Sequence, residues 1–236
     1  MARGGAKELS FKCFSPPVML ATFLIEAGFL IYTLIRYRLN TVARLSAALL
    51  FFLALFQIAE YNVCGGLGVN AASWSRAGFV AITILPALGI HLIYTIAKKP
   101  WNNIIGSVYG MASAWIIVFA ISEKAFSGHV CAGNYVIFQL KPGLGGLYFL
   151  YYYLWLFMGG YLCVKFAKAM ARKNRESLIL FALGYAALLI PTTLANMAKP
   201  ETVQGIPSIM CGFAIVLAGI ITFGIMPALG ARRKFK

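Results

Sequence analysis

Ionisable and polar side chains inside long apolar stretches are the residues of this chain best suited to chemistry. A charged side chain is costly in the middle of a bilayer, so one that lies there is a functional candidate by default. Glu26 falls midway along the first apolar stretch, Glu60 lies near the end of the second, and Arg76 opens the third. The residues that we predict to bind a ligand are Glu26, Gln57, Glu60, Trp74, Arg76, His91, Tyr152, Thr193 and Asn196.

Most of these residues fall in the same half of their apolar stretches, which predicts a polar, aromatic-lined pocket open to one side. Such a pocket suits a small ligand. A structural role stays open for each residue. Glu60 and Arg76 can form a salt bridge at the rim, and the tyrosines around Tyr152 can belong to an interfacial aromatic belt. His91 can bond to a neighbouring helix, and Glu26 is protonated, hydrogen-bonded within a bundle or in contact with water.

The sequence lacks the patterns of common catalytic and cofactor-binding sites. No lysine falls within 205–229 to hold a retinal, and the single histidine inside the apolar stretches disfavours a bis-histidine haem. There is no G-x-S-x-G or H-E-x-x-H motif, and the absence of aspartate removes the usual ligands of metal-assisted phosphoryl transfer. His129 and Cys131 alone are too few to predict a metal site. We therefore predict no catalytic residue, no metal, no cofactor and no enzyme activity.

Seven apolar stretches fill nearly the whole chain and must position these residues. Of the 236 residues, 61% are hydrophobic and 11% are charged, whereas a soluble domain carries about 25% charged residues. A spanning helix needs about 20 apolar residues. We predict an all-α, multi-pass protein of the cell membrane, with one seven-transmembrane helix bundle over residues 1–236. The predicted spans are about 17–36, 42–63, 76–97, 101–122, 146–168, 177–198 and 206–228.

Positive charge is concentrated in alternate connectors, and this pattern predicts the orientation. Positive loops stay in the cytoplasm, so the N-terminus is expected outside and the C-terminus in the cytoplasm, although Arg3, Lys7 and Lys12 argue against it. The net charge of +15 is explained by these loops and by contact with membrane lipid, so we predict no nucleic-acid partner. The basic connector residues are Arg36, Arg38 and Arg44; Lys98 and Lys99; Lys165, Lys168, Arg172, Lys173 and Arg175; and Arg232, Arg233, Lys234 and Lys236.

The one long loop, 123–145, is predicted outside, with a small hairpin over the mouth of the bundle. Its β-like run at 135–138 is bounded by Gly-Asn and Pro-Gly turn signals. Four cysteines, Cys13, Cys64, Cys131 and Cys211, would lie on or near the oxidising side. A Cys64–Cys131 disulfide would tie this loop to the loop after the second span, but the sequence leaves all three pairings of four cysteines open.

Two prolines predict kinks in the helices, and a group of small residues predicts a docking face. Pro86 and Pro191 should kink the third and sixth spans and free backbone carbonyls for other partners. The last span carries small residues that could form an exposed docking face for a neighbouring helix, as Gly212, Ala214, Ala218 and Gly219.

Several short motifs resemble the seven-transmembrane N-terminal sensor region of bacterial histidine kinases. They are the run 56–61 (FQIAEY), then Trp74-Ser75-Arg76, Leu85-Pro86 and His91-Leu92. The resemblance covers essentially the whole chain and implies an extracytoplasmic or intramembrane sensing module. The chain departs from that family because it stops at Lys236 with no kinase or other output domain, so its state is expected to pass to a protein partner in the membrane.

The leading functional hypothesis is a sensor-like or accessory module that binds a small ligand or a partner protein from the outer side. In this mechanism ligand charge competes with a Glu60–Arg76 pair, and kinks at Pro86 and Pro191 let helices shift. A small-solute transporter with three-plus-one-plus-three helices is an alternative, although the expected Pro-Gln pairs are missing. A structural subunit of a larger membrane complex is another.

Overall fold

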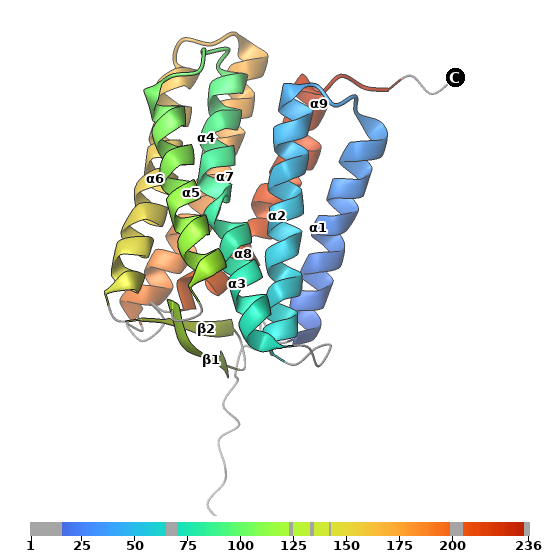
Figure 1. Ribbon diagram of the computed structural model, residues 1–236. Helices are drawn as coiled ribbons and strands as arrows, with labels where there is room; N and C mark the ends of the chain where they lie inside the picture. The colour runs from blue at the N-terminus through green and yellow to red at the C-terminus, as the bar shows by residue number, and fades with distance from the viewer. Residues whose placement is uncertain are drawn as a thin grey trace, which may run out of the picture.

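The computed structural model describes residues 16–64, 70–122, 125–132, 135–141, 143–198 and 205–233. Seven helical spans lie side by side in one bundle (Figure 1). Each is long and apolar enough to cross a membrane, so the predicted helix bundle is confirmed. The helices are α1 (Pro16–Arg36), α2 (Thr41–Val63), α3 (Ala71–Thr83), α4 (Leu85–Ile96), α5 (Asn103–Ile121), α6 (Leu144–Ala167), α7 (Arg172–Ala198), α8 (Ile206–Gly219), the π-helical segment η3 (Ile220–Ile225) and α9 (Met226–Leu229).

Two spans begin earlier than the apolar pattern predicts, because polar residues continue each helix beyond its apolar part. The third span begins at Ala71 and not at residue 76, since the Asn70 side chain accepts a hydrogen bond from the Ala72 N–H and caps the helix. The sixth begins at Arg172 and not at residue 177, where an Arg172–Glu176 pair one turn apart supports the polar first turns.

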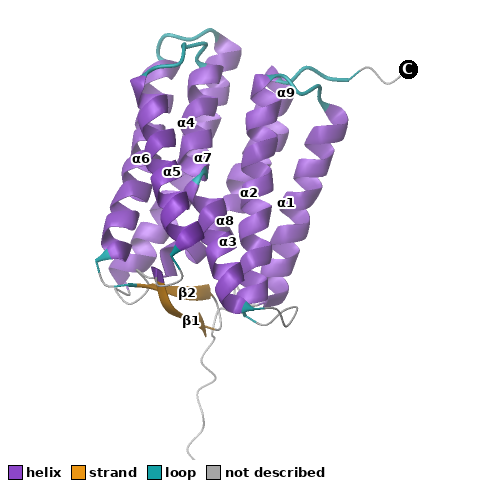
Figure 2. Ribbon diagram, viewed as in Figure 1, coloured by secondary structure: helices purple, strands orange, loops and turns teal. Residues whose placement is uncertain are grey.

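A two-stranded antiparallel hairpin, β1 (Phe126–Ala132) and β2 (Tyr135–Leu140), adds a small sheet to the helical bundle. It lies across one end of the bundle, below α3 and α8 in the view of Figure 2. The hairpin predicted around 135–138 is therefore confirmed. Its buried Phe138 ring packs at 5.2 Å from the Phe79 ring of α3 and at 6.1 Å from the Phe56 ring of α2.

The third span is broken at Ile84, between α3 and α4, as Pro86 predicts. Proline has no N–H and its ring clashes with the preceding turn, and here Pro86 lies in the first turn of α4. The carbonyl of Thr83 at the break accepts a hydrogen bond of 2.8 Å from the Tyr151 hydroxyl of α6. The freed carbonyl thus has a buried partner, and the break is packed and not open to solvent.

At Pro191, α7 continues as one helix, so this proline does not divide its span as Pro86 does, and the expected kink there stays a prediction. The last span is irregular at η3, which directly precedes α9 and its Pro227. The predicted docking face on the last span is wrong for Ala214 and Ala218, whereas Gly212 and Gly219 are half-buried. Ala214 and Ala218 are buried, because α8 turns these small residues toward the other helices of the bundle.

The described basic connectors meet at one end of the bundle, which we call the basic end, and the hairpin lies at the opposite, hairpin end (Figure 1). The C-terminal segment helps to close the basic end. The Arg38 N–H donates to the Ala231 carbonyl at 2.7 Å, and the Arg233 N–H donates to the Arg36 carbonyl at 3.0 Å. The α1–α2 connector is therefore tied to the end of the last span.

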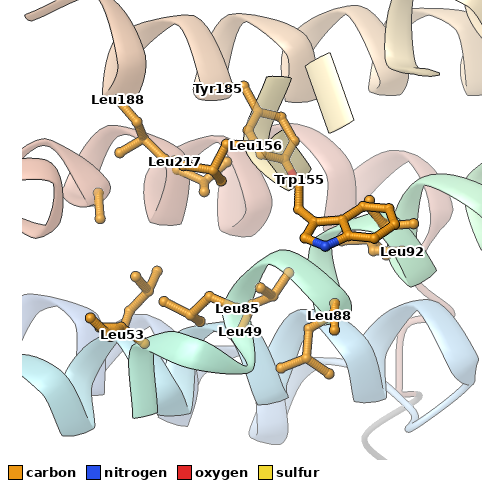
Figure 3. Packing of buried hydrophobic residues seen from close by; sticks show 14 of the residues in the cluster. Leu49, Leu53, Leu85, Leu88, Leu92, Trp155, Leu156, Tyr185, Leu188 and Leu217 are labelled. Atoms are coloured by element: carbon orange, nitrogen blue, oxygen red, sulfur yellow. The ribbon is translucent and has the colours of Figure 1, made fainter. Parts of the chain in front are cut away.

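Near its middle, the bundle is held by a close approach of α4, α6 and α7. The Tyr185 side chain of α7 passes between Gly89 of α4 and Gly159 of α6, and a Cβ placed at Gly159 would lie 2.8 Å from the Tyr185 ring. Figure 3 shows Tyr185 among the surrounding leucines, including Leu156 and Leu217. An apolar cavity of about 30 Å³ adjoins this junction.

We expect Gly159→Leu to lower the free energy of unfolding by about 1–3 kcal/mol, because the new side chain would overlap Tyr185 in a packed interior. Gly160→Leu is the matched control, since no atom lies within 4 Å of a Cβ at that position. Chemical unfolding of both variants in detergent micelles measures the difference. Equal stability of the two would show that the α4–α6–α7 junction is not closely packed.

Candidate functional site

Two carboxyl groups are buried inside the bundle, that of Glu26 midway along α1 and that of Glu60 near the hairpin end of α2. We call them the carboxyl pair. Their exposed fractions are 0% and 1%, and they lie near enough to interact electrostatically. Both oxygens of Glu26 and Oε1 of Glu60 have no hydrogen-bond partner in the described part of the protein. An ionised, unpaired carboxylate is very costly in such a place, so both groups are expected to be protonated.

Gln57 extends this polar cluster by one turn of α2. Its side chain is 2% exposed, and its Nε2 has no acceptor among the described residues. The spacing of Gln57 and Glu60 places both on one face of α2, and Glu60 on that face lies near Glu26 of α1 and Ser208 of α8. The predicted residues Glu26, Gln57 and Glu60 are thus brought together, inside the bundle and not in an open pocket.

Ser208 in the first turn of α8 connects the carboxyl pair to the hairpin. Its hydroxyl oxygen accepts a buried hydrogen bond of 3.1 Å from the Val136 N–H of β2. The same hydroxyl lies near the Glu60 carboxyl. Sequence reasoning missed Ser208, and the available signal was a serine directly after Ile-Pro at the start of a span. The second strand of the hairpin is therefore in polar contact with the bundle interior.

The first strand of the hairpin is fixed by a disulfide between Cys64 and Cys131, with a Cα–Cα distance of 5.8 Å. Cys64 directly follows α2, one turn after Glu60. The structure thus selects one of the pairings that the sequence left open. Cys211 is a buried free thiol near the carboxyl pair, and Cys13 lies outside the described residues.

A polar cleft of about 440 Å³ lies between β1 and the start of α3, and we call it the outer cleft. Arg76 is the only member of the predicted ligand-binding set among its lining residues. The cleft is open and surrounded by hydroxyl, amide and basic groups, which suits a small polar ligand. Its lining residues are Asn70, Ala72, Ser73, Ser75, Arg76, Phe126, Ser127, Gly128 and His129.

The predicted Glu60–Arg76 salt bridge is wrong. Arg76 donates hydrogen bonds to the carbonyls of Phe119 and Ala120 at the end of α5, whereas Glu60 points into the bundle toward α1 and α8. The two residues lie on different helices, α2 and α3, and their side chains point in different directions. Arg76 thereby satisfies backbone carbonyls that the end of α5 leaves without helical partners.

The other predicted residues lie apart from the carboxyl pair. His91 Nδ1 is 3.1 Å from the Tyr109 hydroxyl of α5, which confirms its bond to a neighbouring helix. Asn196 and Thr193 lie against Tyr153 of α6. Tyr152 lines the apolar cavity near the middle of the bundle, and Trp74 packs half-buried on the core. The predicted set therefore does not line one pocket.

No protein-family model matches the sequence, and no curated protein matches it. The resemblance to the sensor region of histidine kinases accordingly stays a prediction. Within the described ranges, no group of three or more histidine, cysteine and acidic side chains gathers where a metal ion could bind. The carboxyl pair, Ser208, the hairpin and the outer cleft are the strongest candidate site.

Proposed function

We propose that the protein is an integral membrane protein with its hairpin end outside and its basic end in the cytoplasm. One feature supports the insertion and two support the orientation. The seven spans have the necessary length and apolar composition, the described basic connectors gather at one end, and the disulfide lies at the other end, where an oxidising compartment would maintain it.

In this orientation the protein acts as a sensor-like module. A small ligand or a partner protein binds at the outer cleft or on the hairpin, and the hairpin passes the change through Ser208 to the carboxyl pair. Movement of α2 and α8 then reaches a second membrane protein that reads the state. The observation that carries this proposal is the double attachment of the hairpin, by a disulfide to α2 and by the Val136–Ser208 hydrogen bond to α8.

The unpartnered polar atoms of the carboxyl pair and of Gln57 give the free-energy difference that a second state of such a relay needs. A buried polar atom without a partner costs about 1–3 kcal/mol, and Glu26, Glu60 and Gln57 all contribute such atoms within the described residues. A rearrangement of α2 or α8 that gives them partners recovers part of that free energy. Ligand binding at the hairpin can therefore select between two packings that differ by a small amount.

We expect Ser208→Ala to speed hydrogen exchange at the Val136 amide by roughly 5- to 10-fold, because a net hydrogen bond contributes about 1 kcal/mol. Ser177→Ala is the control, since Ser177 is a buried helical serine whose hydroxyl donates only to a carbonyl of its own helix. Exchange measured by mass spectrometry in nanodiscs reports the change. An unchanged exchange rate at Val136 would show that the Val136–Ser208 hydrogen bond does not hold the hairpin to α8.

The function is tested by purification from the native membrane in gentle detergent, followed by mass spectrometry of every bound protein and small molecule. We expect a stoichiometric partner or a bound small molecule on the wild type. Ser73→Trp would fill the outer cleft and reduce this occupancy. Gly146→Trp, at an open position of the same end, would leave it unchanged. Equal occupancy in both variants would contradict binding at the outer cleft.

One observation favours a transporter as the second candidate. The third span is broken at Ile84 and Glu26 lies midway along α1, and solute carriers often place discontinuous helices and polar groups near the bilayer midplane. The break here is filled by the Tyr151–Thr83 hydrogen bond, which favours the sensor. Solute flux in proteoliposomes that contain this chain alone would favour the transporter over the sensor.

A further inference from the structure

A groove of about 340 Å³ runs between α6 and α7 at the basic end of the bundle. Its walls are apolar and its rim is cationic. The wall residues are Val164, Ala167, Ile179, Ala182 and Leu183, and the rim residues are Lys168 and Arg175. We call it the lipid groove, for the reasons that follow. It is separate from the carboxyl pair and from the outer cleft, which lie toward the other end.

Both helices place cations and apolar residues in the same order along the groove. Val164 of α6 precedes the C-cap residue Lys168 by one turn, and on α7, Ile179 and Leu183 follow Arg175 by one and two turns. The cations therefore lie at the end of the bundle, and the apolar residues lie deeper. A phospholipid in the adjacent leaflet has the same order, with its headgroup at the surface and its acyl chain below.

The two rim cations are available to a ligand. Both side chains are exposed, and neither takes part in a hydrogen bond or ion pair with another residue that the structure describes. The nearby acid, Glu176, is bound to Arg172 at 2.8 Å. A second hollow, of about 500 Å³, continues from Arg175 past Arg172 and widens the space at headgroup level.

The apolar walls are exposed as well as the rim. The exposed fractions of Val164, Ile179 and Leu183 are 54%, 42% and 56%. In a membrane these side chains contact acyl chains, so the groove offers a lipid tail a shaped apolar surface and its headgroup two positive charges. Charge complementarity favours an acidic headgroup over a zwitterionic one, because basic pockets between spanning helices on the cytoplasmic side bind anionic lipids.

We propose that the lipid groove binds one acidic phospholipid of the cytoplasmic leaflet, with its phosphate between Lys168 and Arg175 and an acyl chain along Val164, Ile179 and Leu183. This inference rests on the membrane insertion proposed above, and it is independent of the sensor role. A bound lipid of this kind would join the ends of α6 and α7, which together with their connector carry Lys165, Lys168, Arg172, Lys173 and Arg175.

The test is native mass spectrometry of the protein after reconstitution in nanodiscs of equal phosphatidylglycerol and phosphatidylcholine. The wild type should retain one phosphatidylglycerol in preference to phosphatidylcholine. The variant Lys168→Gln/Arg175→Gln should lose affinity for it by roughly 30-fold, from about 1 kcal/mol for each basic residue near an anionic membrane surface. Arg38→Gln/Lys98→Gln is the control, because it removes one arginine and one lysine that are exposed at the same end but lie outside the groove.

A second variant tests the acyl-chain part. Ala182→Phe fills the half-buried wall of the groove and keeps both cations, so it should also lose the lipid. Excess inorganic phosphate should not displace phosphatidylglycerol, and displacement would overturn the lipid in favour of a free-phosphate site. Equal retention by the groove and control variants would overturn the inference. A protein that stays in the nanodisc without any lipid preference would also overturn the inference, but it would leave the proposed membrane insertion intact.

Discussion

Replacement of Cys64 and Cys131 by serine is expected to lower the free energy of unfolding by about 2–4 kcal/mol. The two cysteines are 67 residues apart in sequence, so the disulfide removes many conformations from the unfolded chain. In the native protein it also holds β1 against the end of α2. Thermal unfolding in nanodiscs would show a lower midpoint for the double variant.

Reduction of the wild type is the matched control for this prediction. A reductant should lower the midpoint of the wild type to that of the double serine variant, and it should leave the variant unchanged. The other described cysteines, Cys163 and Cys211, are free thiols, so a reductant acts on no other disulfide of the described residues. A double variant as stable as the oxidised wild type would mean that the hairpin is held without the disulfide.

Substitution of Glu26 is expected to have the second large effect, with opposite outcomes for a neutral and a charged replacement. Glu26→Gln keeps a neutral side chain of the same size and should change stability by less than about 1 kcal/mol. Glu26→Lys places an ammonium group at the middle of a helix, which costs about 2.5–3.5 kcal/mol on insertion scales. Unfolding titrations in detergent micelles compare the two variants with the wild type.

Glu176→Lys is the control for charge reversal, because Glu176 lies in an exposed pair with Arg172 and exposed pairs contribute little. We expect it to leave stability unchanged within error. The informative outcome is the glutamine variant. If Glu26→Gln destabilises the protein as strongly as Glu26→Lys does, the native carboxyl is ionised and paired with a cation. The carboxyl pair would then be a charged site and not a neutral relay.

The span pattern, the hairpin and the break at Pro86 were all predictable, because each depends on local sequence alone. A run of apolar residues long enough to cross a bilayer has few alternatives to a helix. Pro86 cannot supply the N–H that a continuous helix needs. The run at 135–138 lies between turn signals, and a strand with such boundaries readily pairs with its neighbour.

The geometry of the site was less predictable, because the rotation of each helix about its own axis is set by packing. Glu60 and Arg76 both lie close to the connector between α2 and α3. The Glu60 side chain is buried in the bundle, whereas Arg76 donates to carbonyls of α5. The role of Ser208 was also not predictable from the sequence. A single serine carries no signal until the fold places the Val136 N–H against it.

The hairpin, Ser208 and the carboxyl pair form one connected unit in this account. Residues that are distant in sequence, Cys64 with Cys131 and Val136 with Ser208, meet at the hairpin end. Each link joins the hairpin to a different helix, so a displacement of the hairpin acts on α2 and α8 together. The carboxyl pair lies where α1, α2 and α8 meet. A displacement of α2 and α8 would therefore change the surroundings of the two carboxyl groups.

The most direct test of this coupling is hydrogen exchange of the reconstituted protein with the disulfide oxidised and then reduced. The account predicts faster exchange on reduction in the hairpin and also at 57–63 of α2 and 206–211 of α8. Segments at the basic end, such as 41–47 of α2, should not change. Faster exchange confined to 125–132 and 135–141 would contradict the account, because the hairpin would then move without affecting the carboxyl pair.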